Sequence, residues 1–506
     1  MSVSWKWLRK SHRMRSFIYK YKDRFGKGSV DKLFSDWHKF IEFGGTLNNT
    51  IHVYHNGEKM FHDFWKAIDE AKQSVHVETY TISPDQTGTI TINKLIEAAK
   101  RGCSVKLIKD GFGSNAMKPE HVQPLIDAGA EVYTFNEKSL RYINFLSRER
   151  ISTPWHRDHR KCAVIDNKIG FCGGMNIEDK YSLKGHYETV IQQIKADERA
   201  KTIQIGPSSV ETLSISSEDY NYEWFYDPVA GIQDPVLREK FSVLKTAFRD
   251  THCRITGPSV AYLADSFFGT IEEVTAEKTS PLKSLARYIK ATREVFTKKN
   301  ESILDKKQEE EEDEEEDKFV ENGVYMMVLA SSPRHGRRQL VKAIQWMTDY
   351  SKKNIYIVTP YFLPPKQLVE CILSAKDRGC EVHIITCGLS DVKPMRLGCI
   401  GLYGKFLKRG VHIYEYNKQT LHAKYMTSDG KFSLLGSFNM DRMSMLSNRE
   451  LGLGVIDEAT AKGLELQFVE DLKHSTELTY DTWQKRPLYL KIVGWVLYKM
   501  MRLLGP

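Results

Sequence analysis

The chain of 506 residues has no apolar run of the roughly 18 residues that a membrane-spanning helix needs. The apolar core of a secretory signal peptide is also missing near Met1. The sequence therefore predicts a protein without a spanning helix or an export signal. Any attachment to a membrane would have to be made at its surface.

Paired cysteine motifs are absent as well. None of the eight cysteines stands in a C-x-x-C pair, and several lie inside apolar runs. This pattern predicts reduced, buried thiols in a reducing compartment. We expect no metal cluster and no cofactor.

The net charge of the chain is modest, at +9. It is compatible with a phosphate-bearing partner, either an anionic membrane or nucleic acid.

The N-terminal segment, residues 1–45, is basic at its start. Residues 1–22 hold seven Lys or Arg and no acid, with aromatic and aliphatic side chains interleaved. Such a segment is typical of a mitochondrial presequence or of a basic helix that lies on a membrane. A solvated tail is the simpler alternative.

The C-terminal segment, residues 485–506, is apolar but interrupted by cations. Lys491, Lys499 and Arg502 fall on one side of a helix, and Trp495 and Tyr498 lie near them. The pattern predicts an amphipathic helix at a membrane surface, with its cations reaching toward the headgroups. The alternative is a helix that packs on the protein's own core.

An acidic run divides the chain in the middle. Residues 309–317 are nine consecutive acids within the charged stretch 298–318. A block of like charges repels itself and stays solvated. We interpret 298–318 as a linker between a first domain, 46–297, and a second domain, 319–484.

The two predicted domains resemble each other. Each contains a strand, a helix, an Arg-Gly-Cys turn and a second strand. The matching segments are 74–80, 92–101 and 104–109 in the first domain, and 354–361, 365–378 and 381–386 in the second. Alternating strands and helices with short glycine turns predict an α/β fold. The repeat predicts two pseudo-symmetric domains, each with a mixed β-sheet flanked by helices.

The candidate catalytic residues occur once in each repeat. Each repeat has the pattern H-x-K-x4-D, followed after six residues by Gly-[Gly/Ser]-x-Asn. Equivalent residues are 263 positions apart throughout. They are His159, Lys161, Asp166, Gly174 and Asn176 in the first domain, and His422, Lys424, Asp429, Ser437 and Asn439 in the second. A motif repeated with its context is a far stronger signal than a single match.

These residue types suit the chemistry of a phosphodiester. Histidine and lysine two positions apart in a strand project from the same face. The lysines, with Asn176 and Asn439, can neutralise and orient a phosphate. One histidine can attack phosphorus while the other protonates the leaving alcohol. We expect Asp166 and Asp429 to hold the imidazoles.

Gly174 and Ser437 complete the expected substrate contacts, because glycines in this motif allow a backbone to approach a ligand closely. No metal is needed in this scheme, since the lysines supply the positive charge. If the pseudo-twofold brings the domains together, the active site lies at their interface.

These motifs are those of the phospholipase D superfamily, and the sequence resembles bacterial-type cardiolipin synthases most. The likeness covers 159–181, 359–364 and 410–416, and includes Asn-Met-Asp at 439–441 and Asn-Arg-Glu at 448–450. The pair Arg-Ser that usually follows is interrupted here by Met443. The acidic linker and the absence of two spanning helices also differ from many members.

The resemblance implies a phosphatidyl transfer to phosphatidylglycerol through a phosphohistidine, giving cardiolipin. By the same analogy, His159 is the nucleophile and His422 the general acid. The phosphatidyl donor stays open: phosphatidylglycerol, phosphatidylethanolamine or a nucleotide-activated diacylglycerol. The expected partners are these phospholipids and an anionic membrane surface, without nucleic acid. The protein is expected at a membrane periphery, at the mitochondrial inner membrane if it is eukaryotic.

Three alternatives remain. A phospholipase D would use water as acceptor and release phosphatidic acid. A nuclease or other phosphodiesterase of the superfamily would require a basic channel with interleaved aromatics. A non-catalytic scaffold is disfavoured, because both copies of the motif are intact.

Overall fold

The computed structural model describes residues 45–136, 156–182, 248–277, 323–332 and 338–504. The predicted N-terminal segment, apart from Gly45, and the predicted linker 298–318 lie outside these ranges. Both therefore remain predictions.

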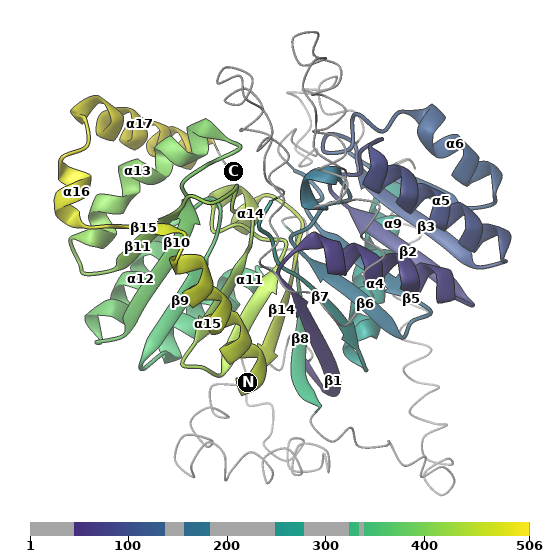
Figure 1. Ribbon diagram of the computed structural model, residues 1–506, viewed down its shortest axis with the longest axis horizontal. Helices are drawn as coiled ribbons and strands as arrows, with labels where there is room; N and C mark the ends of the chain where they lie inside the picture. Colours follow the sequence, from purple (N-terminus) through teal and green to yellow (C-terminus); the bar gives the residue numbers. More distant parts are fainter. Residues whose placement is uncertain (1–44, 137–155, 183–247, 278–322, 333–337, 505–506) are drawn as a thin grey trace, which may run out of the picture.

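Among the described residues, one mixed sheet of 15 strands runs through both halves (Figure 1). In the first half the strand order is β1-β7-β6-β5-β2-β3-β4, and in the second half it is β8-β14-β13-β12-β9-β10-β11, with β15 added at the edge. The strands of the first half are β1 Gly45–Tyr54, β2 Ser74–Thr79, β3 Ser104–Asp110, β4 Glu131–Phe135, β5 Lys161–Ile165, β6 Ile169–Gly173 and β7 His252–Thr256. Those of the second half are β8 Val324–Ser331, β9 Asn354–Val358, β10 Glu381–Cys387, β11 His412–Tyr416, β12 Tyr425–Ser428, β13 Phe432–Gly436, β14 Glu450–Ile456 and β15 Ser475–Leu478.

The identical strand order confirms the predicted α/β fold with two pseudo-symmetric halves. One mixed sheet was predicted in each domain, and β1 pairs with β8 in antiparallel orientation and joins the two sheets edge to edge. Figure 1 shows this seam in the middle of the molecule, with the first half on the right. The seam satisfies two rows of backbone groups that separate sheets would leave unpaired.

Helices cover the sheet in matching positions. The first half has α4 Gly57–Glu70, α5 Gln86–Lys100, α6 Pro119–Asp127 and α9 Ser259–Glu277, with a short 3-10 helix, η1, at Asp179–Tyr181. The second half has α11 Gln339–Tyr350, α12 Lys366–Asp377, α13 Lys393–Leu407, α14 Arg442–Leu446, α15 Glu458–Leu472, α16 Tyr480–Gln484 and α17 Leu488–Leu504. No helix among the described residues is long and apolar enough to cross a membrane.

Three apolar cores hold these layers together. One lies under α4, α5 and α6, a second under α11, α12 and α13, and a third spans both halves under α9 and α15. Strand β5 contributes side chains to two of these cores. Ala163 and Ile165 pack in the first core, while Cys162 and Val164 pack in the third. This alternation follows from the period of two along a strand.

The predicted repeat elements are confirmed with small shifts. Helix α5 begins at Gln86, six residues before the predicted start, because the Asp85 side chain caps it by accepting the N–H of Gly88 at 3.0 Å. The two Arg-Gly-Cys turns place Gly102 and Gly379 at φ of 91° and 95°, where a residue with a Cβ is strained. All eight cysteines are free thiols and seven are buried, as the sequence predicts.

Candidate active site

The two H-x-K motifs meet where the halves join. Lys161 begins β5 and Lys424 directly precedes β12, so each histidine lies in the segment that leads into its strand. The His159 N–H donates to the carbonyl of Arg449 at 3.0 Å, and the His422 N–H donates to the carbonyl of Arg249 at 2.7 Å. Each motif is therefore bonded through its backbone to the opposite half.

Buried carboxylates hold the imidazoles, and they too come from the opposite half. His159 Nδ1 lies 3.0 and 3.1 Å from the two carboxylate oxygens of Glu450. His422 Nδ1 lies 2.7 Å from Asp250 Oδ2. Both carboxylates are fully buried. A carboxylate at Nδ1 stabilises the tautomer that carries the proton there, which leaves the Nε2 lone pair of each ring available to react.

The expected role of Asp166 and Asp429 is wrong. The Asp166 carboxylate accepts the backbone N–H groups of residues 72–74, and Asp429 accepts those of residues 352–354. A strand rises about 3.3 Å per residue, so each aspartate lies roughly 15 Å from the lysine of its motif, just after the last residue of the strand. Both sit at positive φ, 51° and 53°, and brace a turn.

Gly174 and Ser437 support the carboxylates. The Ser437 hydroxyl donates to Glu450 and accepts the N–H of Leu451 at 3.0 Å. At the equivalent Gly174, an added Cβ would lie 2.2 Å from Asp250 Oδ1. The structure thus gives these two positions a role in seating Glu450 and Asp250, and their contact with substrate stays a prediction.

The two asparagines are buried. Asn176 donates to the Tyr181 hydroxyl at 2.9 Å, and that hydroxyl lies 3.3 Å from His422 Nδ1. Asn439 Oδ1 is buried and accepts no hydrogen bond from any described residue. A buried acceptor without a partner is costly, so Asn439 Oδ1 is suited to accept a hydrogen bond from a hydroxyl of a ligand.

The lysines bring two positive charges into the same buried space. Lys161 Nζ donates to the carbonyl of His159 at 2.7 Å, and Lys424 Nζ lies 3.8 Å from Asp250 Oδ2. Lys424 Nζ is also 2.7 Å from His422 Nδ1. Because Asp250 accepts the Nδ1 proton, we assign the Lys424 ammonium to the His422 carbonyl and the Asp250 charge.

Burial shifts the ionisation of this cluster. Burial, followed by the nearby charge of Lys424, lowers the pKa of His422 to about 4 and that of Lys161 to about 7. Burial also lowers the pKa of His159. At neutral pH both rings are therefore neutral bases, each in contact with a carboxylate and close to a lysine that can pair with an anionic ligand.

Glu450 and Asp250 were not predicted as site residues. Glu450 stands in the Asn-Arg-Glu segment already noted. Asp250 lies 200 positions before Glu450, not 263, so the spacing of the repeat does not reveal it. The strand register shows that they are equivalent. Gly173 pairs with His252, which lies two residues after Asp250, and the equivalent Gly436 pairs with Gly452, which lies two residues after Glu450. The first half has far more chain between its asparagine and its carboxylate, which hides the repeat.

A buried arginine precedes each carboxylate and fixes it to a helix of the other half. Arg249 donates to Asp471 on α15 at 3.1 and 2.9 Å. Arg449 also pairs with a helix of the other half, through one nitrogen: Nη1 donates to Glu273 on α9, and Nη2 donates to Thr270 at 2.6 Å. Bidentate and buried ion pairs of this kind give fixed geometry, and breaking one leaves an uncompensated charge.

Two neutral imidazoles, two lysines and two amides in one buried junction of a doubled α/β fold define a phosphodiester-transferring protein of the phospholipase D type. The family model described as "Cardiolipin synthase, PLD-like domain" matches residues 64–204 and 347–472, which is more than half of the chain. The chain belongs to this family.

Individual relatives agree with the assignment. The chain is 26% identical to cardiolipin synthase 1 of Bacillus cereus, over 92% of this chain and 74% of the relative. It is also 26% identical to a cardiolipin synthase of Clostridium perfringens, over 88% and 75% of the two chains. The crystal structure of a phosphatidylserine synthase from Haemophilus influenzae shares the fold, with a TM-score of 0.56 and 16% identity over 90% of this chain and 93% of that one.

Proposed function

We propose that this protein is a cardiolipin synthase that transfers a phosphatidyl group to phosphatidylglycerol through a phosphohistidine. The observation that carries the proposal is the pair of carboxylate-held imidazoles, His159 with Glu450 and His422 with Asp250, flanked by Lys161 and Lys424. Such a set supplies a nucleophile, a proton donor and charge neutralisation for one phosphodiester.

In the first step, His159 Nε2 attacks phosphorus. A P–N bond forms, the P–O bond to the donor's head group breaks, and His422 gives its proton to the leaving oxygen. In the second step, His422 removes the proton from a hydroxyl of phosphatidylglycerol, whose oxygen attacks phosphorus. The P–N bond then breaks and His159 is restored.

Within this scheme the lysines and asparagines stabilise the negative charge on the non-bridging oxygens. His422 has a low pKa in the free site because of burial and Lys424. The negative charge of a bound phosphodiester offsets the positive charge of Lys424 and so favours the protonated ring that donation requires.

Helix α17 is the proposed attachment to the membrane. Its Gly494 packs against Gly401 of α13, where an added Cβ would meet backbone atoms at 2.4 Å. The helix is therefore docked on the protein, as the alternative interpretation held. It still exposes a continuous apolar face made of Leu488, Tyr489, Ile492, Val493, Trp495, Val496 and Met500.

The charges on α17, and exposed apolar side chains in one loop of each half, favour a lipid surface as the partner. Lys491 and Lys499 flank the apolar face, and Lys499 Nζ lies 5.3 Å above the Trp495 ring. Exposed apolar side chains also occur in loops that follow β3 and β10, at Phe112 and Leu389. We place this edge against an anionic bilayer, where tryptophan and lysine suit the headgroup layer. A peripheral position is proposed, at the mitochondrial inner membrane in a eukaryote.

The activity is tested by incubating the purified full chain with phosphatidylglycerol vesicles and identifying products by mass spectrometry. Cardiolipin with glycerol supports the proposal, and phosphatidic acid with no cardiolipin would replace it by a phospholipase D. Parallel vesicles that add phosphatidylethanolamine or a nucleotide-activated diacylglycerol identify the donor from the released head group. His159→Asn and His422→Asn are the inactive controls. Single- and double-stranded DNA should not be cleaved.

The nucleophile is tested by trapping the phosphorylated enzyme with a labelled donor and mapping the label. We expect it on His159. A label on His422 would exchange the two roles without changing the reaction.

Membrane attachment is tested with Ile492→Glu combined with Trp495→Glu, both on the exposed face of α17. Binding to anionic vesicles should fall at least tenfold, while turnover of a short-chain soluble lipid is retained. Leu466→Glu, an equally exposed apolar position on α15, is the matched control. Unchanged vesicle binding in the α17 variant would show that the attachment lies elsewhere.

A further inference from the structure

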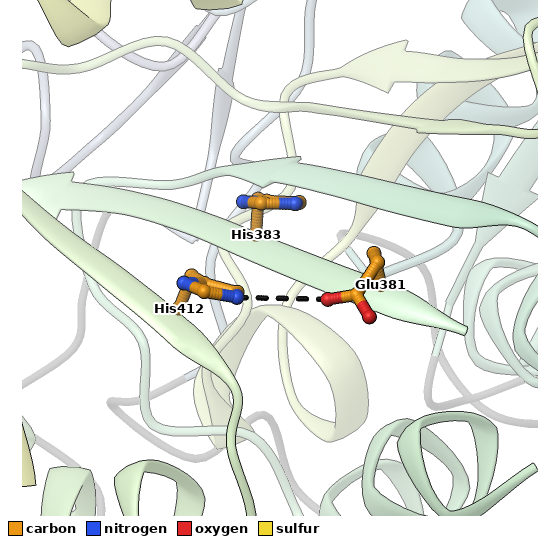
Figure 2. A group of neighbouring side chains, drawn as sticks. All are labelled: Glu381, His383 and His412. Atoms are coloured by element: carbon orange, nitrogen blue, oxygen red, sulfur yellow. Dashed lines mark ion pairs between the residues drawn. The ribbon is translucent and has the colours of Figure 1, made fainter. Parts of the chain in front are cut away.

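A second cluster of ligand-type side chains lies on the outer strands of the second half, away from the catalytic junction. Glu381 and His383 stand two positions apart on β10 and so share one face, and His412 lies on β11 directly beside His383 (Figure 2). Glu381 pairs with the first residue of β9 and His383 with its middle residue, Tyr356, whereas Lys424 lies beyond the end of β9. The cluster is therefore separate from the active site.

The geometry offers three ligand atoms to one point. A carboxylate oxygen of Glu381 and one nitrogen from each ring all lie within 4.8 Å of one another. Figure 2 shows the two rings side by side, with an edge nitrogen of each on the side where Glu381 lies. His412 Nε2 is already 3.5 Å from Glu381 Oε2.

The other nitrogen of each ring faces its own hydrogen-bond partner. His412 Nδ1 lies 3.2 Å from Glu477 Oε1 on β15, and His383 Nδ1 lies 3.4 Å from the Tyr414 hydroxyl. A carboxylate at Nδ1 holds the proton there and leaves Nε2 as a lone-pair donor, which is the arrangement found around histidines that bind metals. Simple surface ion pairing of His412 would not require His383 to be oriented in the same way.

We propose that Glu381, His383 and His412 form a binding site for a zinc-like divalent transition metal, with His412 positioned by Glu477. Two imidazole nitrogens and one carboxylate oxygen, completed by water, suit Zn²⁺. The ion joins β10 to β11 near the edge of the sheet and acts as a structural clip.

Binding requires two local adjustments. The stacked rings, with centroids 4.6 Å apart, must tilt so that both Nε2 atoms come within about 2.1 Å of the ion. Lys376 Nζ donates to Glu381 Oε2 at 2.8 Å, and this is the same oxygen that lies 3.5 Å from His412 Nε2. Lys376 competes with the ion for this carboxylate, so Lys376→Met should strengthen binding.

The test uses the full chain, freed of metal by a chelator, and zinc chloride as the probe. Calorimetry should show a zinc equivalent that is lost, or weakened at least tenfold, in His412→Gln and in Glu381→Gln. His62→Gln, an exposed histidine on α4 that also lies next to a carboxylate, is the matched control and should bind as the wild type does. Cobalt, substituted for zinc, should give visible absorption bands in the wild type only.

Thermal unfolding provides a second readout. Zinc should raise the melting temperature of the wild type and of His62→Gln, but not of the two site variants, whose metal-free melting temperatures serve as their own references. Absence of stoichiometric zinc binding would overturn the proposal. Zinc binding that is unchanged in both site variants would overturn it too, because the metal would then be held by other residues, such as the free thiols.

Discussion

His159 and Glu450 stand 291 positions apart in the sequence, and the Nδ1 atom of His159 lies 3.0 Å from a carboxylate oxygen of Glu450. His422 and Asp250 repeat this relationship in the opposite direction, from the second half to the first. Each half therefore completes the other's histidine, and neither half alone contains a working acid–base pair.

Removing one of these charges should slow catalysis without preventing folding. In Glu450→Gln and Asp250→Asn the side chain keeps its shape but no longer stabilises the reactive tautomer. We expect kcat to fall about 100- to 10,000-fold, as occurs when a buried carboxylate that orients a catalytic histidine becomes an amide. Steady-state kinetics on a soluble lipid measures the effect, with the exposed Glu458→Gln as control. Wild-type kcat in either folded variant would contradict the crossed arrangement.

Asp166 and Asp429 should matter for stability and little for chemistry. Replacing either with alanine leaves three backbone N–H groups without their acceptor and puts at positive φ a residue that tolerates this conformation less well than aspartate does. We expect a loss of about 1–3 kcal/mol in the free energy of unfolding, with kcat of the folded protein unchanged. Asn, which tolerates positive φ, should be milder. Urea unfolding and kinetics on the same samples separate the effect on stability from the effect on kcat. A large fall in kcat in a variant of unchanged stability would show that the aspartate contributes to catalysis.

Gly174 and Ser437 contact the two carboxylates in different ways, so we expect substitutions at these equivalent positions to lower kcat by different amounts. In Gly174→Ala the new methyl displaces Asp250, so His422 loses its partner and kcat should fall at least 100-fold, comparable with Asp250→Asn. In Ser437→Ala, Glu450 loses one neutral donor, worth about 1 kcal/mol, so the fall should be tenfold or less. The opposite ranking of kcat values would show that Ser437 contacts the substrate.

Substrate affinity should depend on the charge of Lys161. Its pKa is lowered to about 7 by burial and by Lys424, so the ligand-free site carries this positive charge below pH 7 and loses it above. The dissociation constant for a soluble phosphodiester should be flat below pH 7 and rise by up to about tenfold per pH unit above it. In Lys161→Met the dissociation constant should be high at every pH. A wild-type affinity that is constant from pH 6 to 9 would exclude this titration.

The acidic run should be dispensable for chemistry. Deleting residues 309–317 removes a stretch whose like charges favour solvation over burial. We expect the specific activity on a soluble lipid to stay within about twofold, because such runs add little to a packed core. A large loss of activity in a folded protein would reveal a role for the segment.

Much of this molecule can be predicted from the sequence, because its repeat is local. Strand and helix periods, the glycine turns and the H-x-K pairs occur at fixed spacing in both halves, so the α/β class, the pseudo-symmetry and the four central residues follow directly. Side chains two apart in a strand share a face whatever the rest of the chain does. The amphipathic pattern around Leu488–Leu504 likewise predicts helix α17.

What only the tertiary structure decided is which side chains from distant segments meet. The length of β5 carries Asp166 away from His159, and the crossing of the two halves brings in Glu450 and Asp250, which no fixed spacing connects to their histidines. The pairing of β1 with β8 joins two expected sheets into one. These contacts depend on strand order and on packing between halves, and such long-range arrangements are set by the burial and hydrogen bonding of the whole fold, not by the local pattern of any one segment.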